Sequence, residues 1–248
     1  MERIKLFCLP YAGGSAMMYK RWSKLMDHAI ELAPIELANR GTRSKHPHYE
    51  NLNQAVDDLY KWILPYLDGS PFAFFGHSMG SLLSYELIHK IKELTGQEPI
   101  HAFFSGRNPP HIIKEESVAF DSGKEEFLED LRQLGGMPVE ILESEPLLDY
   151  VLPIIRGDFK MMSTYSYVPR SAKFEFNISA LGGKADKEVP VEDLREWAQF
   201  TNRECRTVLF EGGHFFINEL PEEIVSLITR TLRTALLAGR GRGGSLHA

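Results

Sequence analysis

The segment Phe72-Ala73-Phe74-Phe75-Gly76-His77-Ser78-Met79-Gly80 decides the fold. Its first four residues form a continuous apolar run, as expected of a β-strand that is buried on both faces. The last five fit the pattern Gly-x-Ser-x-Gly, and a helical pattern from Ser81 to Leu94 follows directly. A tight turn between a buried strand and a helix holds a serine hydroxyl clear of the backbone, and flanking glycines leave room for it. Ser78 is therefore our candidate nucleophile; the alternative is an ordinary serine in a glycine-rich turn.

Short apolar runs alternate with helical patterns along most of the chain. We predict strands at 4–9, 30–37, 72–75, 100–105, 174–181 and 207–210, and helices at 16–26, 52–66, 81–94, 191–200 and 221–237. Ser15 is positioned to cap the first of these helices. The alternation predicts an α/β fold in which helices cover both faces of a mostly parallel sheet.

The alternation is interrupted between Asn108 and Tyr165, where only helical patterns occur. Ser122-Gly123-Lys124-Glu125 fits a capping box that would begin a helix, and Gly135 would end it. A second apolar stripe runs from Leu147 to Ile155. We interpret this block as a helical lid inserted into one core domain. The predicted division is a core of residues 1–107 and 166–238, a lid of 108–165 and a flexible tail of 239–248.

Composition limits the classes of function. The chain has 248 residues, of which 43% are hydrophobic and 25% charged, so one sizeable core is expected. The net charge of -6 gives no reason to expect nucleic-acid binding. No apolar run approaches the length of a membrane span, no signal-peptide pattern is present, and Cys8 and Cys205 make no disulfide framework. We therefore expect a cytoplasmic protein without nucleic-acid or membrane partners.

A serine nucleophile needs a general base, and His214 is the candidate. It follows Gly212-Gly213 directly after the last predicted strand and precedes the last helix. That position lies at the carboxyl edge of the sheet, where Ser78 is also expected. In folds with this type of serine turn, the chain order is serine, then acid, then histidine.

Asp186 is the favoured acid to orient the histidine. It follows the strand at 174–181 through a short loop, which again places it at the carboxyl edge. A carboxylate there can hold the imidazole tautomer and stabilise the imidazolium. Glu188 and Asp193 are nearby alternatives, whereas Asp158 fits the chain order but lies in the insertion.

The developing oxyanion of an acyl transfer needs two backbone N–H donors. We assign one to Met79, the residue after the nucleophile. The second is expected in the loop Pro10-Tyr11-Ala12-Gly13-Gly14, from Ala12 or Tyr11. The two glycines could also serve only to form a tight turn into the next helix.

Several other residues are better explained by structure than by catalysis. His77 should point away from the reacting face, and Met161-Met162 should belong to the core. Arg40 and Arg43 could meet an anionic substrate group, although a solvated surface loop is the favoured interpretation. No metal-binding or dinucleotide-binding pattern occurs, so no cofactor is expected.

Motifs along the chain resemble those of the type II thioesterases, free-standing editing hydrolases of nonribosomal peptide and polyketide synthases with the α/β-hydrolase fold. They run from about residue 4 to residue 237: Leu9-Pro10-Tyr11-Ala12-Gly13-Gly14-Ser15-Ala16, Gly76-His77-Ser78-Met79-Gly80, Ser105-Gly106-Arg107, Leu134-Gly135-Gly136-Met137-Pro138, Leu152-Pro153-Ile154-Ile155-Arg156-Gly157-Asp158-Phe159, Leu181-Gly182-Gly183 and Gly212-Gly213-His214-Phe215-Phe216. The serine motif identifies only the superfamily, whereas the two motifs inside the insertion are more specific. Asn39-Arg40-Gly41-Thr42-Arg43 departs from the family's usual Gly-Arg start, which leaves the role of these arginines open.

The resemblance implies a function. The family's triad corresponds to Ser78, Asp186 and His214, and its members release acyl groups from the 4'-phosphopantetheine arm of carrier proteins. It therefore implies peptidyl or acyl carrier domains of a synthase as partners, short or aberrant acyl groups as substrates, and no cofactor beyond the arm on the carrier. A small-molecule carboxylesterase of the same fold and a catalytically inert binding protein are the alternatives.

Overall fold

The computed structural model describes residues 3–114 and 117–243, and within them the fold is built on one parallel sheet. The sheet has six strands in the order β2-β1-β3-β4-β5-β6, with every neighbouring pair parallel. The strands are β1 (Ile4–Leu9), β2 (Ile30–Pro34), β3 (Phe72–His77), β4 (His101–Ser105), β5 (Asn177–Gly183) and β6 (Cys205–Phe210). The predicted α/β fold class is confirmed.

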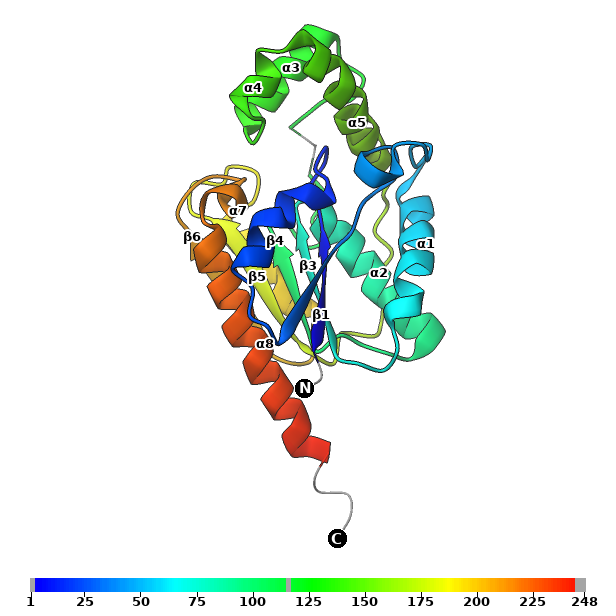
Figure 1. The fold of residues 1–248 in the computed structure, drawn as a ribbon, viewed down its shortest axis with the longest axis vertical. Helices are drawn as coiled ribbons and strands as arrows, with labels where there is room; N and C mark the ends of the chain where they lie inside the picture. Colours follow the sequence, from blue (N-terminus) through cyan, green and yellow to red (C-terminus); the bar gives the residue numbers. More distant parts are fainter. Residues whose placement is uncertain (1–2, 115–116, 244–248) are drawn as a thin grey trace.

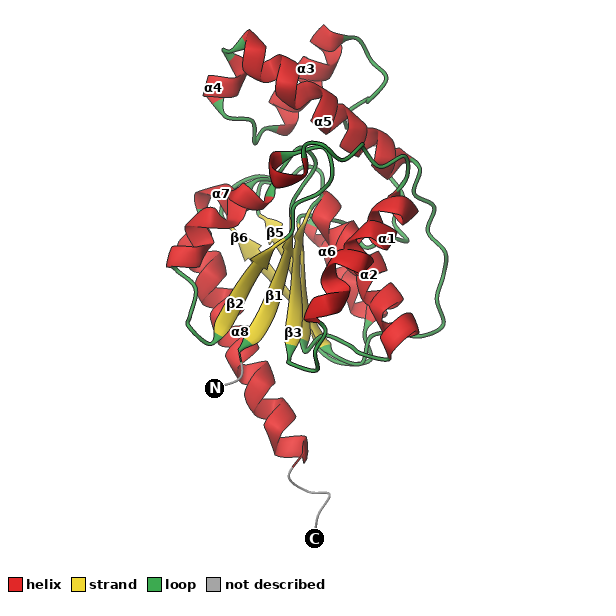
Figure 2. Ribbon diagram, turned by 45° about the vertical axis from the view of Figure 1, so that its right-hand side comes forward, coloured by secondary structure: helices red, strands yellow, loops and turns green. Residues whose placement is uncertain are grey.

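Helices cover both faces of this sheet (Figure 2). On one face lie α1 (Leu52–Ile63), α2 (Met79–Thr95) and α6 (Val191–Arg195), and their apolar residues share a core with Phe7, Phe74 and Phe104. On the other face lie a 3₁₀ helix (Ala16–Lys24) and α8 (Pro221–Gly243). The two layers explain why β3 and β4 are buried along their whole length. A sheet covered on both faces requires apolar side chains in both directions along its central strands.

Three helices form the insertion between β4 and β5: α3 (Lys124–Leu134), α4 (Val139–Leu142) and α5 (Glu145–Ser163). They lie beyond the carboxyl ends of the strands, apart from the two helical layers (Figure 1). Within the described part of the chain, residues 108–165 contain no strand, as predicted. The predicted capping box is wrong, because Gly123 occupies the N-cap of α3 and the Ser122 hydroxyl instead donates to the Ala119 carbonyl at 2.8 Å.

Several element ends differ from the predictions. β2 ends at Pro34 and not at position 37, and β6 begins at Cys205 and not at position 207. β5 begins at Asn177 and not at Phe174, which instead forms an isolated bridge with Thr201. α8 continues to Gly243, so the predicted end at Leu237 is wrong and the first residues of the predicted tail are helical. Each residue added to an existing helix contributes a backbone hydrogen bond, so α8 continues although glycine, which alternates with arginine here, is a poor helix former. Residues 244–248, the rest of the predicted tail, lie outside the described residues.

The remaining predicted helices are in place. Ser15 caps the 3₁₀ helix, its hydroxyl accepting from the Met17 N–H at 3.2 Å. α2 ends at Gly96, whose φ of 72° is the left-handed conformation of a helix C-cap. A one-turn helix, α7 (Phe216–Glu219), precedes α8. Among residues 3–114 and 117–243, none of the helices has both the length and the apolar character to cross a membrane.

Candidate active site

Ser78 lies between β3 and α2 on a strained turn. Its φ of 51° and ψ of -115° form a backbone conformation that residues with a side chain rarely adopt. The glycines on either side are required by contact: a methyl group on Gly76 would overlap the backbone of Gly80, and one on Gly80 would overlap the Leu9 carbonyl. The Gly-x-Ser-x-Gly motif therefore has a steric cause in this fold, and the turn is a nucleophile elbow.

Hydrogen bonds tie this elbow to the end of the neighbouring strand β4. The Ser78 N–H donates to the Ser105 carbonyl at 2.7 Å. The Ser81 hydroxyl lies 2.8 Å from the Gly76 carbonyl and 2.9 Å from the Ser105 carbonyl. All of these groups are buried or nearly so, which fixes the strained turn from both strands.

The His214 ring is held by Asp186. Its Nδ1 atom lies 2.9 Å from Asp186 Oδ2, and the two side chains are 8% and 0% exposed. The other carboxylate oxygen, Oδ1, accepts from the backbone N–H groups of Glu188 at 2.9 Å and Val189 at 3.3 Å. With its carboxylate fixed in this way, Asp186 can select the His214 tautomer that leaves Nε2 free to accept a proton. Asp193, one of the alternative acids, instead pairs with Lys114.

The loops that carry Asp186 and His214 lie against each other. The Ala185 N–H donates to the Gly212 carbonyl at 2.9 Å, and a methyl group on Gly183 would overlap the carbonyl of Gly213. Both loops follow adjacent parallel strands, β5 and β6, so the acid and the histidine emerge at the same edge as Ser78.

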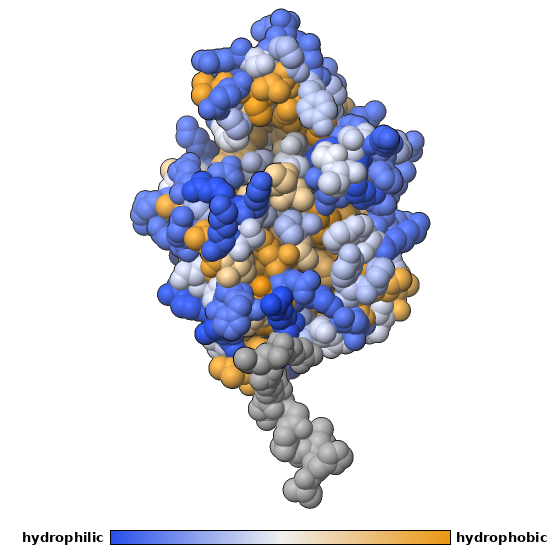
Figure 3. Space-filling view, in the orientation of Figure 1, coloured by the Kyte–Doolittle hydropathy of each residue, from blue (hydrophilic) through white to orange (hydrophobic). Residues whose placement is uncertain are grey.

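Ser78 and His214 both line two clefts that meet at them. The larger cleft has a volume of about 240 Å³ and lies under the insertion. Its apolar lining from the insertion is Leu131, Leu134, Ile141, Val151, Ile155 and Phe159. Figure 3 shows apolar side chains gathered on the insertion above a hollow that separates it from the body. Among the described residues, no hydrogen bond joins the Ser78 hydroxyl to His214; such contacts often form only once substrate is bound.

The second cleft, of about 70 Å³, has a mixed lining. It carries the backbone or side chains of Asn108, Lys114 and Glu188 beside the apolar Met162. Ser78 therefore lies between one mainly apolar cleft and one partly polar cleft. A substrate with an apolar acyl group and a polar leaving group matches this division.

The backbone donors expected for an oxyanion lie on both sides of the elbow. The N–H groups of Met79 and Ala12 donate to no acceptor among the described residues, so both are free to bind an oxyanion. Ala12 lines the larger cleft with Ser78, and so does Tyr11, the alternative donor. The next N–H along this loop, that of Gly13, is not free, because it donates to Asp158 at 2.7 Å.

His77 lies behind the candidate base. Its ring is fully buried, its Nδ1 is 2.9 Å from the Ser105 hydroxyl, and its centroid is 5.3 Å from that of His214. Burial in this apolar environment holds the pKa of His77 well below its usual value, so the ring is neutral. A neutral, buried ring that is hydrogen-bonded to Ser105 of β4 agrees with a structural role for His77 and not a catalytic one.

The favoured interpretation of Arg40 and Arg43 as a solvated surface loop is wrong. Arg40 is only 2% exposed and forms an ion pair with Asp158, while the Arg43 Nη1 lies 2.8 Å from Asp58 Oδ2. The Asp158 side chain is 1% exposed. Sequence reasoning missed this pair because its members are 118 residues apart; the only signal was the position of Asp158 in the specific motif of the insertion.

The parallel sheet, the strained serine at its carboxyl edge and the adjacent His–Asp pair place the protein in the α/β-hydrolase fold class. Residues 4–232 match the thioesterase domain family, and the chain belongs to that family. It is a hydrolase of thioesters.

Known proteins resemble the chain over almost its whole length. The gramicidin S biosynthesis protein GrsT of Aneurinibacillus migulanus is 36% identical over 234 residues, which are 94% of this chain and 91% of that protein. The crystal structure of ClbQ from the colibactin NRPS/PKS pathway superposes with a TM-score of 0.91 at 33% identity, covering 95% of this chain and 99% of that one. The type II thioesterase BorB from the borrelidin biosynthetic cluster superposes with a TM-score of 0.83 at 28% identity, over 92% of each chain. The similarity to type II thioesterases expected from the motifs is confirmed.

Proposed function

We propose that this protein is a type II thioesterase that releases short or aberrant acyl groups from the 4'-phosphopantetheine arm of carrier proteins in nonribosomal peptide or polyketide biosynthesis. The observation that carries the proposal is the apolar cleft beneath the insertion, which opens directly onto Ser78. The similarity to GrsT, ClbQ and BorB, whose names refer to such pathways, supports the choice of substrate.

In the proposed mechanism, the Ser78 hydroxyl attacks the thioester carbonyl while His214 Nε2 accepts its proton. Asp186 stabilises the imidazolium through Nδ1. The N–H groups of Met79 and Ala12 bind the oxyanion of the tetrahedral intermediate. Collapse of that intermediate expels the thiol of the arm, which takes the proton from His214 and leaves an acyl ester on Ser78.

Hydrolysis then regenerates the enzyme. His214 removes a proton from a water molecule, which attacks the acyl ester through a second tetrahedral intermediate. Ser78 leaves with the proton returned by His214, and the free carboxylic acid is released. All of these groups belong to the chain, so the proposed reaction needs no cofactor other than the arm that carries the substrate.

The insertion has the role of a lid in this proposal. Its apolar side chains would surround the acyl group in the larger cleft, while the smaller, partly polar cleft would accept the amide-containing arm. The partners would be peptidyl or acyl carrier domains, with no nucleic acid and no membrane involved. The enzyme would act in the cytoplasm beside its synthase.

The test compares an acetyl group on a holo-carrier protein, acetyl-CoA and a p-nitrophenyl ester as substrates of the wild type and of Ser78→Ala. Loss of the nucleophile should lower kcat by about 10⁴–10⁶. A Ser78-dependent preference for the carrier-bound thioester supports the proposal. Activity confined to the p-nitrophenyl ester would overturn it in favour of a small-molecule esterase, and a protein that does not react with a fluorophosphonate at Ser78 would overturn the mechanism.

A further inference from the structure

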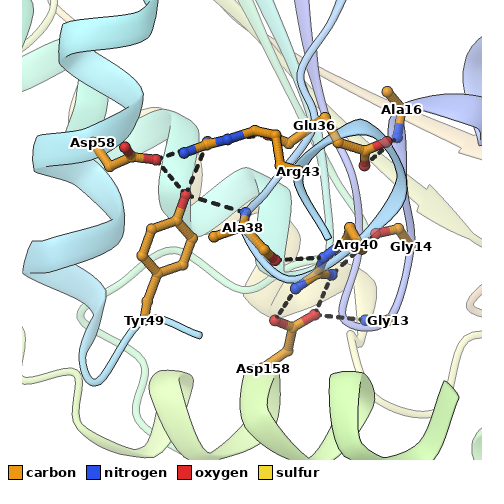
Figure 4. A network of polar contacts seen from close by, with 10 residues as sticks. All are labelled: Gly13, Gly14, Ala16, Glu36, Ala38, Arg40, Arg43, Tyr49, Asp58 and Asp158. Carbon is orange, nitrogen blue, oxygen red and sulfur yellow. Dashed lines mark hydrogen bonds and ion pairs between the residues drawn. The ribbon is translucent and has the colours of Figure 1, made fainter. Parts of the chain in front are cut away.

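A buried ion pair joins the insertion to the loop after β2. The Arg40 Nη1 and Nη2 atoms lie 2.6 Å and 2.5 Å from the two oxygens of Asp158, in a fork-to-fork arrangement (Figure 4). The two side chains are 3% and 1% exposed. Paired charges at this depth persist only when most of their hydrogen-bonding groups are satisfied.

Two further hydrogen bonds of this pair go to the loop after β1, and a third stays within the loop after β2. Asp158 Oδ2 also accepts from the Gly13 N–H at 2.7 Å, and the Arg40 Nη1 also donates to the Gly14 carbonyl at 3.0 Å. The Arg40 Nε donates to the Ala38 carbonyl at 3.2 Å. One ion pair thus fixes two peptide groups of the loop that carries Ala12, the one between residues 12 and 13 and the one between residues 14 and 15 (Figure 4).

Packing leaves this loop little room to move. Gly13 has a φ of 77°, and a methyl group on it would overlap the side chain of Ile155 on α5. Two residues further along the same helix, a methyl group on Gly157 would lie 2.5 Å from the His48 ring. Residues 155–158 of α5 therefore pack against the loops after β1 and β2, and the Arg40–Asp158 ion pair lies at this contact.

We propose that Asp158 and Arg40 are positioning residues for the oxyanion hole. The Gly13 N–H belongs to the same peptide group as the Ala12 carbonyl, so the bond to Asp158 fixes the plane of that group. The adjoining peptide group carries the Ala12 N–H, and fixing its neighbour restricts the directions in which that N–H can point. The inference rests on the proposed mechanism, in which that N–H binds the oxyanion. In this proposal, the conformation of the loop after β1, here called the catalytic loop, depends on the Asp158 side chain of the insertion.

The rival explanation is that the ion pair only fastens the insertion to the core. The two are separated by the double variant Arg40→Met/Asp158→Leu, because apolar residues of similar size can replace a buried ion pair without loss of stability. This variant keeps the packing but removes the acceptor of the Gly13 N–H. Arg40→Leu/Asp158→Met provides a second apolar variant that also lacks an acceptor for the Gly13 N–H. Asp149→Asn on the same helix is the matched control, since Asp149 is 63% exposed and pairs with Lys124.

Four quantities should be measured on each folded variant, with folding checked by thermal unfolding. They are kcat and KM for a p-nitrophenyl ester, the affinity for phenylboronic acid, which forms a tetrahedral adduct with a nucleophilic serine, and the affinity for octanoate. Misplacing one oxyanion donor should lower kcat by roughly 10–10³-fold with little change in KM. We expect the boronate affinity to fall by a similar factor, the octanoate affinity to stay the same, and the control to behave as wild type.

The inference is overturned if the double variant is folded and keeps the wild-type kcat and boronate affinity, or if the boronate and octanoate affinities fall together. If the first double variant does not fold, the same kinetic and affinity ratios measured on Arg40→Leu/Asp158→Met decide the question. None of these assays requires a carrier protein. A failure of the proposed substrate assignment would therefore appear as a lack of carrier-thioester turnover by the wild type, separately from this result.

Discussion

The carboxyl edge of the sheet and the insertion are held in place by different kinds of contact. At the sheet edge, backbone lies against backbone: a methyl group on Gly76, Gly80 or Gly183 would overlap main-chain atoms of the adjacent turn. The insertion meets the core through side chains, namely the Arg40–Asp158 ion pair and the apolar residues above the larger cleft. Backbone contacts leave almost no freedom in the positions of Ser78 and His214, whereas side-chain contacts can change with substitution.

In the proposed function, the sheet edge carries out the reaction, and the insertion determines the shape of the acyl site. We expect substitutions at the sheet edge to affect every substrate equally. Substitutions in the insertion should discriminate among substrates, except at Asp158, where the insertion touches the catalytic loop.

Asp186→Asn should lower kcat by about 10³–10⁴ for thioester and oxygen-ester substrates alike, because an amide can stabilise the wrong tautomer of His214. Steady-state kinetics on both substrates measures the effect. Lys187→Gln, at an exposed position of the same loop that lines neither cleft, is the control and should change kcat little. If Glu188→Gln had the larger effect, the assignment of Asp186 as the orienting acid would be wrong.

Gly13→Ala should destabilise the fold by about 2–5 kcal/mol, since it combines a left-handed backbone with an overlap against Ile155. Gly96→Ala isolates the backbone contribution, because Gly96 has a φ of 72° with open space around it, and should cost about 1–2 kcal/mol. Denaturant unfolding measures both. Adding Ile155→Ala to Gly13→Ala should restore part of the loss; purely additive effects would contradict the close approach of loop and helix.

Val151→Trp places a bulky indole ring in the apolar cleft and so reduces the space for a long acyl chain. It should lower kcat/KM for an octanoyl thioester by about 10–200-fold while leaving kcat/KM for an acetyl thioester nearly unchanged. Leu147→Trp is the control, because Leu147 lies on the same helix, is 45% exposed and does not line the cleft. Equal loss on both acyl groups would show that the insertion does not select substrates by size.

His101→Gln should weaken the acid sensitivity of the core. Burial lowers the pKa of His101 to about 4, while in the unfolded chain it stays near its ordinary value of about 6.5. Between those values the unfolded state binds a proton that the folded state excludes, so stability falls as the pH decreases, by about 1.4 kcal/mol per pH unit. Urea unfolding between pH 6.5 and 4.5 should show a shallower decline in the variant. The exposed His28→Gln is the control; an unchanged slope in His101→Gln would contradict the prediction.

The sequence predicted the sheet edge well because local patterns determine it. A strand, a glycine-flanked serine and a helix adjacent in the chain are sufficient to place Ser78, and chain order along parallel strands places Asp186 and His214 near it. The Arg40–Asp158 pair could not be predicted in this way. Charged residues in loops and helices are usually solvated, and only the packing of α5 over two loops far away in the sequence buries these two.

Element ends were harder to predict than the elements themselves. Ser122 has the residue type of a helix cap but uses its hydroxyl in the turn before α3, because Gly123 takes the capping position. Similarly, the apolar residues at the start of the predicted fifth strand pack into the core from an irregular segment, where Phe174 contacts Thr201. Burial alone does not distinguish a strand from a packed loop.

The strained backbone of Ser78 has a consequence for how such an enzyme can evolve. The conformation at φ 51° and ψ -115° is unfavourable by about 1–3 kcal/mol for any residue with a side chain, and glycine is the residue that would relax it. Glycine, however, has no hydroxyl. Selection for stability and selection for turnover therefore oppose each other at this single position, and descendants that lose the reaction are free to become more stable. An inactive descendant of this lineage would be expected to carry glycine at position 78 more often than alanine or threonine.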